Sequence, residues 1–406
     1  MTNYEIFTLE NGIRVVHNKT RSKVAQIALT VGAGTRDELE KEHGIAHLTE
    51  HMLFRGTTKH SAYQISHLIE SRGGELNAYT TKEETVLHCT ALCKDTARIV
   101  QLLGEMMFKP LLSPKDTESE KEIIIDEINS YKDTPSELIF DDFEEQLFAG
   151  SALGRNILGD RKNLMKMGDQ QIKNYLKRTF TTDQIVLTAS TNMLHKRFKE
   201  IATKTFGEIP LTTRDFSRKK TTPISPFDIV RLENTYQTHS LVGTYAPALN
   251  SEMRLPTVLL TNILGGPSSI SLLNQELREK RSLTYNVEAN YTPYHDSGLM
   301  SVYFSCEEQK YEEAYELTEK IIKEICTTEL SPAKFNAFKR QFLNSLIISN
   351  ENIESLMLAV GKSMVTFGKF DSRETIYKKL DQLTAKDMLN TANEIFSKTL
   401  CKLIYK

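Results

Sequence analysis

The sequence lacks several features that would place a protein in a specialised class. It contains no tryptophan, and its five cysteines are scattered and odd in number, which favours reduced thiols over a disulfide framework. Basic and acidic residues number 51 and 53, so the net charge of −2 creates no field that attracts nucleic acid or an anionic membrane. No apolar run approaches the roughly 18 residues of a membrane span. We therefore expect no nucleic-acid partner and no membrane insertion.

The N-terminal residues also lack a targeting signal. The segment that starts at Met1 has neither a basic n-region followed by an apolar h-region nor the arginine-rich character of a transit peptide. Together with the scattered cysteines, this predicts a cytoplasmic protein. The 406 residues are too many for one ordinary hydrophobic core, so we expect two or three domains.

Weak internal repeats suggest that one unit is duplicated. Leu-Glu-Asn at position 9 recurs at 232, Leu-Ser-Pro at 112 recurs at 330, and 169–180 resembles 386–396. All three pairs are offset by roughly 220 residues, about the size of one domain. We predict homologous domains at 1–210 and 228–406, joined by a linker at 211–227. The linker is rich in proline, and its basic cluster of Arg214, Arg218, Lys219 and Lys220 is expected to be a solvated face.

Within each domain the pattern mixes strands and helices. Helices interleaved with hairpin-length strands favour an α+β fold over a doubly wound parallel sheet. No glycine-rich nucleotide-binding motif opens a helix, so nucleotide chemistry has no support. In the first domain, strands are predicted at 12–17, 24–31, 84–92 and 183–190, and helices at 45–54, 62–71, 99–108 and 119–131.

The sharpest motif is His47-Leu48-Thr49-Glu50-His51. On a helix, positions i and i+4 share a face, so both imidazoles can point at one ion. Two neutral imidazoles are good zinc ligands and leave room for a third ligand and a water molecule. Glu50 lies beside that face, where it can take a proton from the water. The alternative is two surface histidines beside a surface glutamate.

The order H-x-x-E-H is the inverted zincin pattern, and here the chain resembles the pitrilysin/insulinase zinc metallopeptidases. The branch it resembles contains bacterial processing proteases and mitochondrial processing peptidase. The resemblance covers nearly the whole chain, and four stretches carry it: His47–Thr57 (HLTEHMLFRGT), Gly73–Thr80 (GGELNAYT), Glu120–Ile128 (EKEIIIDEI) and Leu153–Gly159 (LGRNILG). The resemblance implies two homologous domains, each with a largely antiparallel sheet packed with helices.

The resemblance also implies the third zinc ligand. The family places a glutamate about 76 residues after the second histidine, which is Glu127 here, and Glu120 falls on its supporting acidic position. The two glutamates are seven residues apart, so they share one helix face. Ile123, Ile125 and Ile128 are expected to face the core beside them. A carboxylate at Glu120 could orient a ligand histidine, whereas the alternative is an exposed helical glutamate.

Substrate-binding residues are likewise implied by the resemblance. Asn77 and Ala78 stand where the family presents a sheet edge to an extended peptide, which can add as a further strand. In the second domain the family carries an arginine and a tyrosine seven apart that contact the peptide, and Arg278 and Tyr285 fit this spacing. Arg281 is the next choice. The tyrosine hydroxyl could donate to a developing oxyanion, and the arginine could hold a carbonyl or carboxylate.

The function expected from these observations is a zinc endopeptidase, with one zinc per chain, acting on oligopeptides or unfolded chains inside a chamber. His47, His51 and Glu127 are the expected ligands, Glu50 the base, and Arg278 and Tyr285 the groups that complete the site. The alternative is a non-catalytic scaffold or partner subunit. Because one chain carries both residue sets, we expect a homodimer, and a heterodimer with a related chain is the other assembly.

Overall fold

The computed structural model describes residues 4–233 and 235–406, so the first three residues of the N-terminal segment considered above lie outside it. The chain forms two compact units. Unit 1 comprises Met1–Asn129, Arg155–Arg218 and Asn350–Phe370, and unit 2 comprises Ser130–Gly154, Lys219–Ser349 and Asp371–Lys406. Each unit therefore includes a segment from the far half of the chain. The predicted boundaries at 210 and 228, which concern homologous halves, stay a prediction.

Unit 1 contains a six-stranded mixed sheet in the order β1-β2-β6-β3-β5-β4. Only β2 and β6 pair in parallel, and the other neighbours are antiparallel. β4 pairs with β5 and ends the sheet on that side. The strands are β1 (Tyr4–Thr8), β2 (Arg14–Lys19), β3 (Val24–Val31), β4 (Glu75–Thr80), β5 (Thr85–Leu92) and β6 (Ile185–Thr191).

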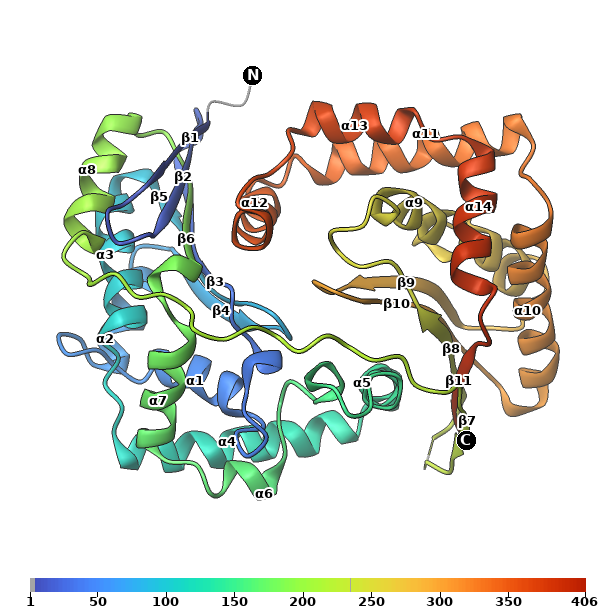
Figure 1. Ribbon diagram of the computed structural model, residues 1–406, viewed down its shortest axis with the longest axis horizontal. Coiled ribbons are helices and arrows are strands. Elements are labelled where there is room, and N and C mark those ends of the chain that lie inside the picture. Colours follow the sequence, from blue (N-terminus) through green and yellow to red (C-terminus); the bar gives the residue numbers. More distant parts are fainter. Residues whose placement is uncertain (1–3, 234) are drawn as a thin grey trace. The chain divides into compact units, whose positions relative to one another are not determined.

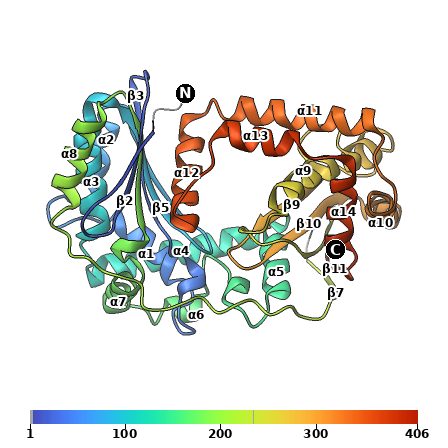
Figure 2. The ribbon, with the colours of Figure 1, turned by 45° about the horizontal axis from the view of Figure 1, so that its top comes forward.

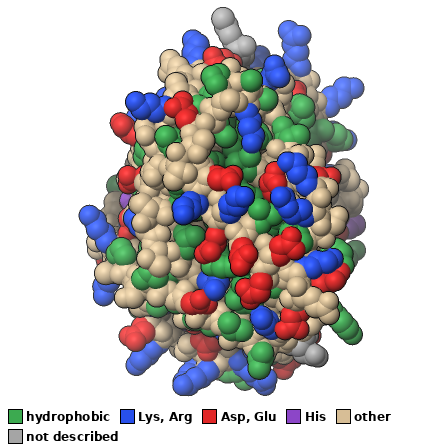
Figure 3. Space-filling view, turned by 90° about the vertical axis from the view of Figure 1, so that its right-hand side faces the viewer, with side chains coloured by type: hydrophobic (Ala, Val, Ile, Leu, Met, Phe, Trp, Pro, Cys, Tyr) green, Lys and Arg blue, Asp and Glu red, His purple; other side chains and the backbone are tan. Residues whose placement is uncertain are grey.

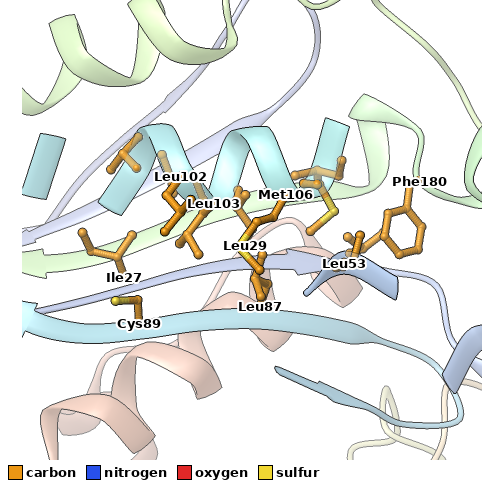
Figure 4. Packing of buried hydrophobic residues seen from close by; sticks show 14 of the residues in the cluster. Ile27, Leu29, Leu53, Leu87, Cys89, Leu102, Leu103, Met106 and Phe180 are labelled. Atoms are coloured by element: carbon orange, nitrogen blue, oxygen red, sulfur yellow. The ribbon is translucent and has the colours of Figure 1, made fainter. Parts of the chain in front are cut away.

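Most helices of unit 1 cover one face of this sheet and enclose its main core. Figure 4 shows part of this core, where Leu102, Leu103 and Met106 of α3 pack over Leu29 and Leu87 of β3 and β5. Apart from α12 (Ile353–Phe367), the helices of unit 1 are α1 (Ile45–Leu53), α2 (Ala62–Glu70), α3 (Thr96–Phe108), most of α4 (Pro114–Lys132), α6 (Arg161–Leu164), α7 (Asp169–Thr179) and α8 (His195–Phe206).

The opposite face of the unit 1 sheet is covered by α12 (Ile353–Phe367), which comes from the C-terminal part of the chain. Figures 1 and 2 both show α12 across the sheet from α3 and α8. Val360 and Met364 of α12 pack with Val16 and Val186 of the sheet in a separate apolar cluster. β6 is buried along its whole length, so its second face needs this cover.

Unit 2 repeats the plan with a five-stranded mixed sheet in the order β7-β11-β8-β10-β9. Here β7 and β11 form the parallel pair, so this order matches that of the last five strands of unit 1. The strands are β7 (Asp228–Arg231), β8 (Thr238–Tyr245), β9 (Asn286–Pro293), β10 (Gly298–Cys306) and β11 (Cys401–Tyr405). The helices packed with them are α9 (Arg254–Gly265), α10 (Tyr311–Thr327), α11 (Pro332–Ser349), α13 (Arg373–Asp381) and α14 (Ala385–Phe396).

The second face of this sheet is covered by α5 (Pro135–Leu147), from the N-terminal half of the chain. Phe143 and Leu147 of α5 pack with Leu241, Leu403 and Tyr405 of the sheet. The two units are thus built alike, each closed by one helix from the other half. The α+β class and the two-unit plan predicted from the sequence are confirmed, with mixed sheets in both units.

Two sequence expectations are wrong in detail. Arg214 and Arg218 are not a solvated face, because Arg218 binds the buried carboxylate of Asp37 through Nε (2.9 Å) and Nη2 (2.7 Å), and Arg214 donates to the carbonyl of Gly32. A fully buried carboxylate needs a cationic partner, and the first part of the linker supplies it. Ile123 is exposed rather than in the core, which takes Ile124 instead.

In residues 4–233 and 235–406, no helix combines the length and apolar character that crossing a lipid bilayer requires. Figure 3 shows one face of the molecule, on which Lys and Arg side chains are interspersed with Asp and Glu side chains.

We predict that Met364→Ala destabilises the protein by about 2–5 kcal/mol, because a buried thioether side chain of α12 is lost from a packed cluster. Urea unfolding followed by circular dichroism should show a lower midpoint. Ser355→Ala, at an exposed position of the same helix, should change stability by less than about 0.5 kcal/mol. Equal midpoints for the two variants would show that α12 contributes little to unit 1.

Candidate metal centre

Helix α1 positions the two histidines of the motif. Its apolar side, with Ile45, Leu48 and Met52, is fully buried in the core of unit 1. His47 and His51 project together from another side, one turn apart, with ring centroids 4.6 Å apart and planes at 76°. A nine-residue helix that is anchored along its apolar side can hold both imidazoles in one direction.

Glu127 of α4 meets these histidines. Its Oε2 lies 3.9 Å from His47 Nε2 and 3.8 Å from His51 Nε2, and the three donor atoms lie within 4.8 Å of one another. Glu120, two turns earlier on α4, is buried, whereas the Glu127 side chain is 45% exposed. Seven residues advance a helix by nearly two full turns, so the two carboxylates lie on the same side of α4. The exposures show that Glu120 lies deeper in the protein than Glu127.

The donor set fits a zinc ion. Tetrahedral zinc with bonds of 2.0–2.1 Å separates its ligands by about 3.3 Å, so the donors, at 3.8 and 3.9 Å from Glu127, need to approach only slightly to bind one ion. Gaps of 3.8 and 3.9 Å are too long for hydrogen bonds, so direct contacts do not account for the convergence. Burial, with a smaller effect of His51, lowers the pKa of His47 to about 4, and burial also lowers the pKa of His51. Both rings are then neutral near pH 7, as metal ligation requires.

A carboxylate orients one of the histidines. His51 Nδ1 lies 2.7 Å from Glu120 Oε2, so that Nε2 is left to face Glu127. The other oxygen of Glu120 accepts from Nε and Nη2 of Arg55. Arg55 was not singled out in the sequence, although it lies four residues after His51 inside a motif stretch. A buried carboxylate between an imidazole and a guanidinium is the arrangement that holds a ligand histidine in one tautomer.

Glu50 lies on α1 between the two histidines in sequence. Burial raises the pKa of Glu50, and the neighbouring Thr80 side chain and His51 act in the opposite direction. A carboxyl group with a raised pKa holds a proton more readily than an exposed glutamate does, which suits a group that takes a proton from water beside a metal-binding cluster. Thr80, at the end of β4, is a second neighbour that sequence reasoning missed. Its only signal in the sequence is its place at the end of the motif stretch Gly73–Thr80.

Asn77 and Ala78 lie on β4, the strand at the end of the unit 1 sheet. Asn77 is exposed and donates through Nδ2 to Glu75 Oε1 at 2.6 Å, while Ala78 packs against the main core. β4 pairs with β5, with Asn77 opposite His88, and no other described strand pairs with it. Among the described residues, the backbone on its outer side therefore has no strand partner.

Arg278 and Tyr285 both belong to unit 2. Arg278 lies in a short π-helical segment, Asn274–Glu279. Its guanidinium forms an ion pair with Glu279 at 2.9 Å. Tyr285 is 61% exposed and donates its hydroxyl to Glu307 at 3.1 Å. Arg281, the next choice, pairs with Glu276. The roles assigned to these residues, and to the others of the site, stay predictions.

Comparisons with known proteins identify the family of this fold. Residues 14–161 match the family described as Insulinase (Peptidase family M16), and residues 166–342 match the Peptidase M16 inactive domain. A protein of Rickettsia felis named an uncharacterized zinc protease is 30% identical over 398 residues, covering 97% of this chain and 95% of its own. The Bacillus subtilis zinc protease YmxG, also named uncharacterized, is 26% identical, covering 96% and 95%. The chain therefore belongs to the insulinase family of peptidases, family M16.

Solved structures share the fold. The crystal structure of a protease from Helicobacter pylori superposes with a TM-score of 0.92 at 17% identity, covering 100% of both chains. A Pseudomonas fluorescens structure described as a peptidase M16 inactive domain superposes with a TM-score of 0.90 at 18% identity, covering 99% of this chain and 97% of the other. The resemblance expected from the motifs is thus confirmed at the level of family and fold.

We predict that Glu127→Gln loses most of its zinc, because a neutral amide is a poor ligand. Glu120→Gln should weaken zinc binding by about 10–100-fold, as is typical when a partner of a ligand histidine is changed. Glu122→Gln, at an exposed position of the same helix, is the matched control and should bind zinc as the wild type does. Metal analysis of the purified variants and competition with a chromophoric chelator measure both effects. Wild-type stoichiometry in Glu127→Gln would contradict the ligand assignment.

Proposed function

We propose that this chain is a zinc-dependent endopeptidase that hydrolyses oligopeptides and unfolded polypeptides. The observation that carries the proposal is the convergence of His47, His51 and Glu127, with Glu50 near His51 and Glu127. The family and the names of the relatives, which are zinc proteases, support the same metal and the same class of reaction. Zinc, when bound by the three donors, supplies a Lewis acid that polarises a peptide carbonyl and acidifies a water molecule.

The chain's own residues perform the remaining tasks in this proposal. Glu50 accepts the proton of the attacking water and passes it to the leaving amine. Glu120, supported by Arg55, keeps His51 in the tautomer whose Nε2 faces Glu127. These groups come from α1, α4 and the residues just after α1, so their relative positions are set by the core of unit 1.

The substrate is proposed to bind as an extended strand beside β4. Main-chain hydrogen bonds to the outer side of β4 require a peptide whose own backbone groups are free, which excludes a folded protein. Asn77 and Ala78 would then contact the peptide. The side-chain amide of Asn77 would donate its hydrogen bond to the peptide backbone instead of to Glu75. This selects for unfolded or short chains and depends little on the identity of the side chains.

The proposal extends to Arg278, Tyr285 and the assembly. We propose that Arg278 holds a peptide carbonyl or carboxylate and that the Tyr285 hydroxyl donates to the oxyanion. Because one chain carries both residue sets, a homodimer is the proposed assembly, and the mass of the protein in solution tests it. A non-catalytic partner subunit is the alternative, and it would bind peptide without turnover.

Substituting Glu50 by Gln is expected to abolish peptide hydrolysis while zinc stays bound. The amide keeps the shape of the side chain but cannot accept the proton of water, and Glu50 is not among the three converging donors. Turnover of a quenched peptide library and zinc content of the same preparation are measured together. Loss of zinc in this variant would place Glu50 among the ligands and overturn the role given to it.

Tyr285→Phe is expected to lower kcat by about 10²–10³-fold with zinc content unchanged, because one oxyanion donor is removed. Glu307→Ala is the control, since it removes the acceptor of the hydrogen bond that Tyr285 makes here but leaves the tyrosine hydroxyl in place. Arg278→Ala should mainly raise KM, whereas Arg281→Ala should not. Unchanged kinetics in both Tyr285→Phe and Arg278→Ala would show that the family pair was assigned to the wrong residues.

A further inference from the structure

The helix that carries the histidines begins without a capping side chain of its own. The residue before it, Gly44, has a left-handed backbone (φ 101°) and no side chain that could accept from the first N–H groups. The N–H group of Ala46, in the first turn, and that of Gly44 itself donate instead to the side chain of Glu38, six residues before Gly44. Glu38 Oε1 accepts from Ala46 N at 3.0 Å and from Gly44 N at 3.1 Å, and Oε2 lies 3.2 Å from Gly44 N.

This contact sits directly beside the metal-binding residues. Ala46, whose N–H group Glu38 holds, is followed by His47, and the turn that starts there carries Glu50 and His51. The helix moves as one short rod, so a shift of its first turn displaces all three functional side chains together. A metal site tolerates displacements of only about 0.5 Å before its geometry is lost. A contact that fixes the start of α1 therefore also fixes the positions of His47, Glu50 and His51.

The main chain around Glu38 is held in place by residues 155–159, a segment that has no part in the proposed mechanism. Arg155 Nη1 donates to the carbonyl of Glu38 at 2.8 Å, and His43 Nε2 lies 2.9 Å from the carbonyl of Asn156. Both contacts come from Leu153–Gly159, one of the four motif stretches. Glu38 itself is only 5% exposed, so its carboxyl group has no alternative partner in bulk water.

The same segment touches the start of α1 through two glycine residues. A Cβ atom on Gly159 would lie 2.4 Å from the Cα of Gly44 and 2.9 Å from its nitrogen. Both glycines have positive φ angles, 80° and 101°. This backbone-to-backbone contact leaves no room for a side chain, so it sets how closely Leu153–Gly159 approaches the helix.

We propose that Glu38, backed by the Leu153–Gly159 segment, is a positioning residue that fixes the start of α1 and thereby the placement of His47, Glu50 and His51. This inference rests on the proposed zinc-dependent function. Burial raises the pKa of Glu38 to about 8, and the N–H groups of Ala46 and Gly44 act in the opposite direction. A carboxyl group keeps an acceptor oxygen in either protonation state, so Gln is the conservative replacement and Ala the disruptive one.

The test measures zinc affinity without reference to activity. Glu38→Ala should weaken zinc binding by about 10–100-fold in a chelator competition, the size seen when a residue supporting a metal ligand is lost. Glu38→Gln should recover most of the affinity. In the peptidase assay, Glu38→Ala should lower kcat with KM unchanged, because β4 is untouched. A role limited to stability would lower the unfolding midpoint but leave the zinc affinity of the folded protein as in the wild type.

Glu42→Ala is the matched control for the charge and the loop. Its carboxylate binds Arg178 (2.6 Å) and the N–H of Leu39 (3.0 Å), but its side chain accepts from none of the N–H groups of α1. We expect its zinc affinity to equal that of the wild type. A loss equal to that of Glu38→Ala would show that any disturbance of the loop suffices, and would overturn the specific role of Glu38.

A second variant changes Gly159, the residue of the Leu153–Gly159 segment that contacts Gly44. It tests whether the start of α1 controls zinc affinity even if Glu38→Ala does not fold. Gly159→Ala should weaken zinc binding, because its new methyl group meets Gly44. Gly150→Ala is its control, since Gly150 has a similar φ of 77° but open space around it, and zinc affinity should not change. Wild-type affinity in both Glu38→Gln and Gly159→Ala, with no loss in any folded Glu38→Ala, would overturn the inference. Absence of zinc binding by the wild type would instead refute the proposed function.

Discussion

The 2.7 Å contact between His51 Nδ1 and Glu120 Oε2 is the interaction on which the candidate metal centre depends. It joins α1 to α4, the two helices that carry the converging donors. An isolated helix of nine residues is not stable in water, so α1 takes its place from tertiary contacts rather than from its own propensity. Because Glu127 follows Glu120 on the same helix, fixing Glu120 against His51 also fixes the distance from Glu127 to both imidazoles.

The contact is in turn supported on three sides. Arg55 binds the second oxygen of Glu120, and the apolar side of α1 is buried in the main core of unit 1. Glu38 accepts from the N–H groups of Ala46, in the first turn of α1, and of Gly44, which precedes it. A buried carboxylate is tolerated only when charged or hydrogen-bonding partners replace water, and Glu120 has both. The polar groups around the metal centre therefore form one connected arrangement.

Each unit requires a helix from the far part of the chain. The apolar strands of both sheets are buried on both faces, and α12 and α5 supply the second cover. A consequence for unit 1 is that residues 350–370, remote in sequence from the metal centre, take part in the domain that holds it. The chain is duplicated in plan, but each unit is completed by the other half.

Local patterns were sufficient for much of this architecture. The strand at 24–31 and the starts of the helices at 45 and 62 coincide with β3, α1 and α2, because strand-forming residues and helical spacing are encoded by neighbouring residues. The i, i+4 spacing of His47 and His51 sets their common face by helix geometry alone. The strand β4 was not among the strands predicted from residue patterns, although Leu76 and Ala78 alternate with Glu75 and Asn77. Its place at a sheet edge was implied only by the family resemblance.

Only the tertiary structure decided the contacts between segments distant in sequence. The position of α12 across the sheet from α3, the salt bridge from Arg218 to Asp37, and the partners of Arg55 and Glu38 have no local signature. On α4, the sequence could not tell that Ile124 rather than Ile123 enters the core, because three isoleucines in a row are equivalent until a neighbouring surface selects one side. Helical and strand periods follow from residues a few positions apart, whereas the choice of a buried partner depends on which surfaces remain to be covered once the whole chain has folded.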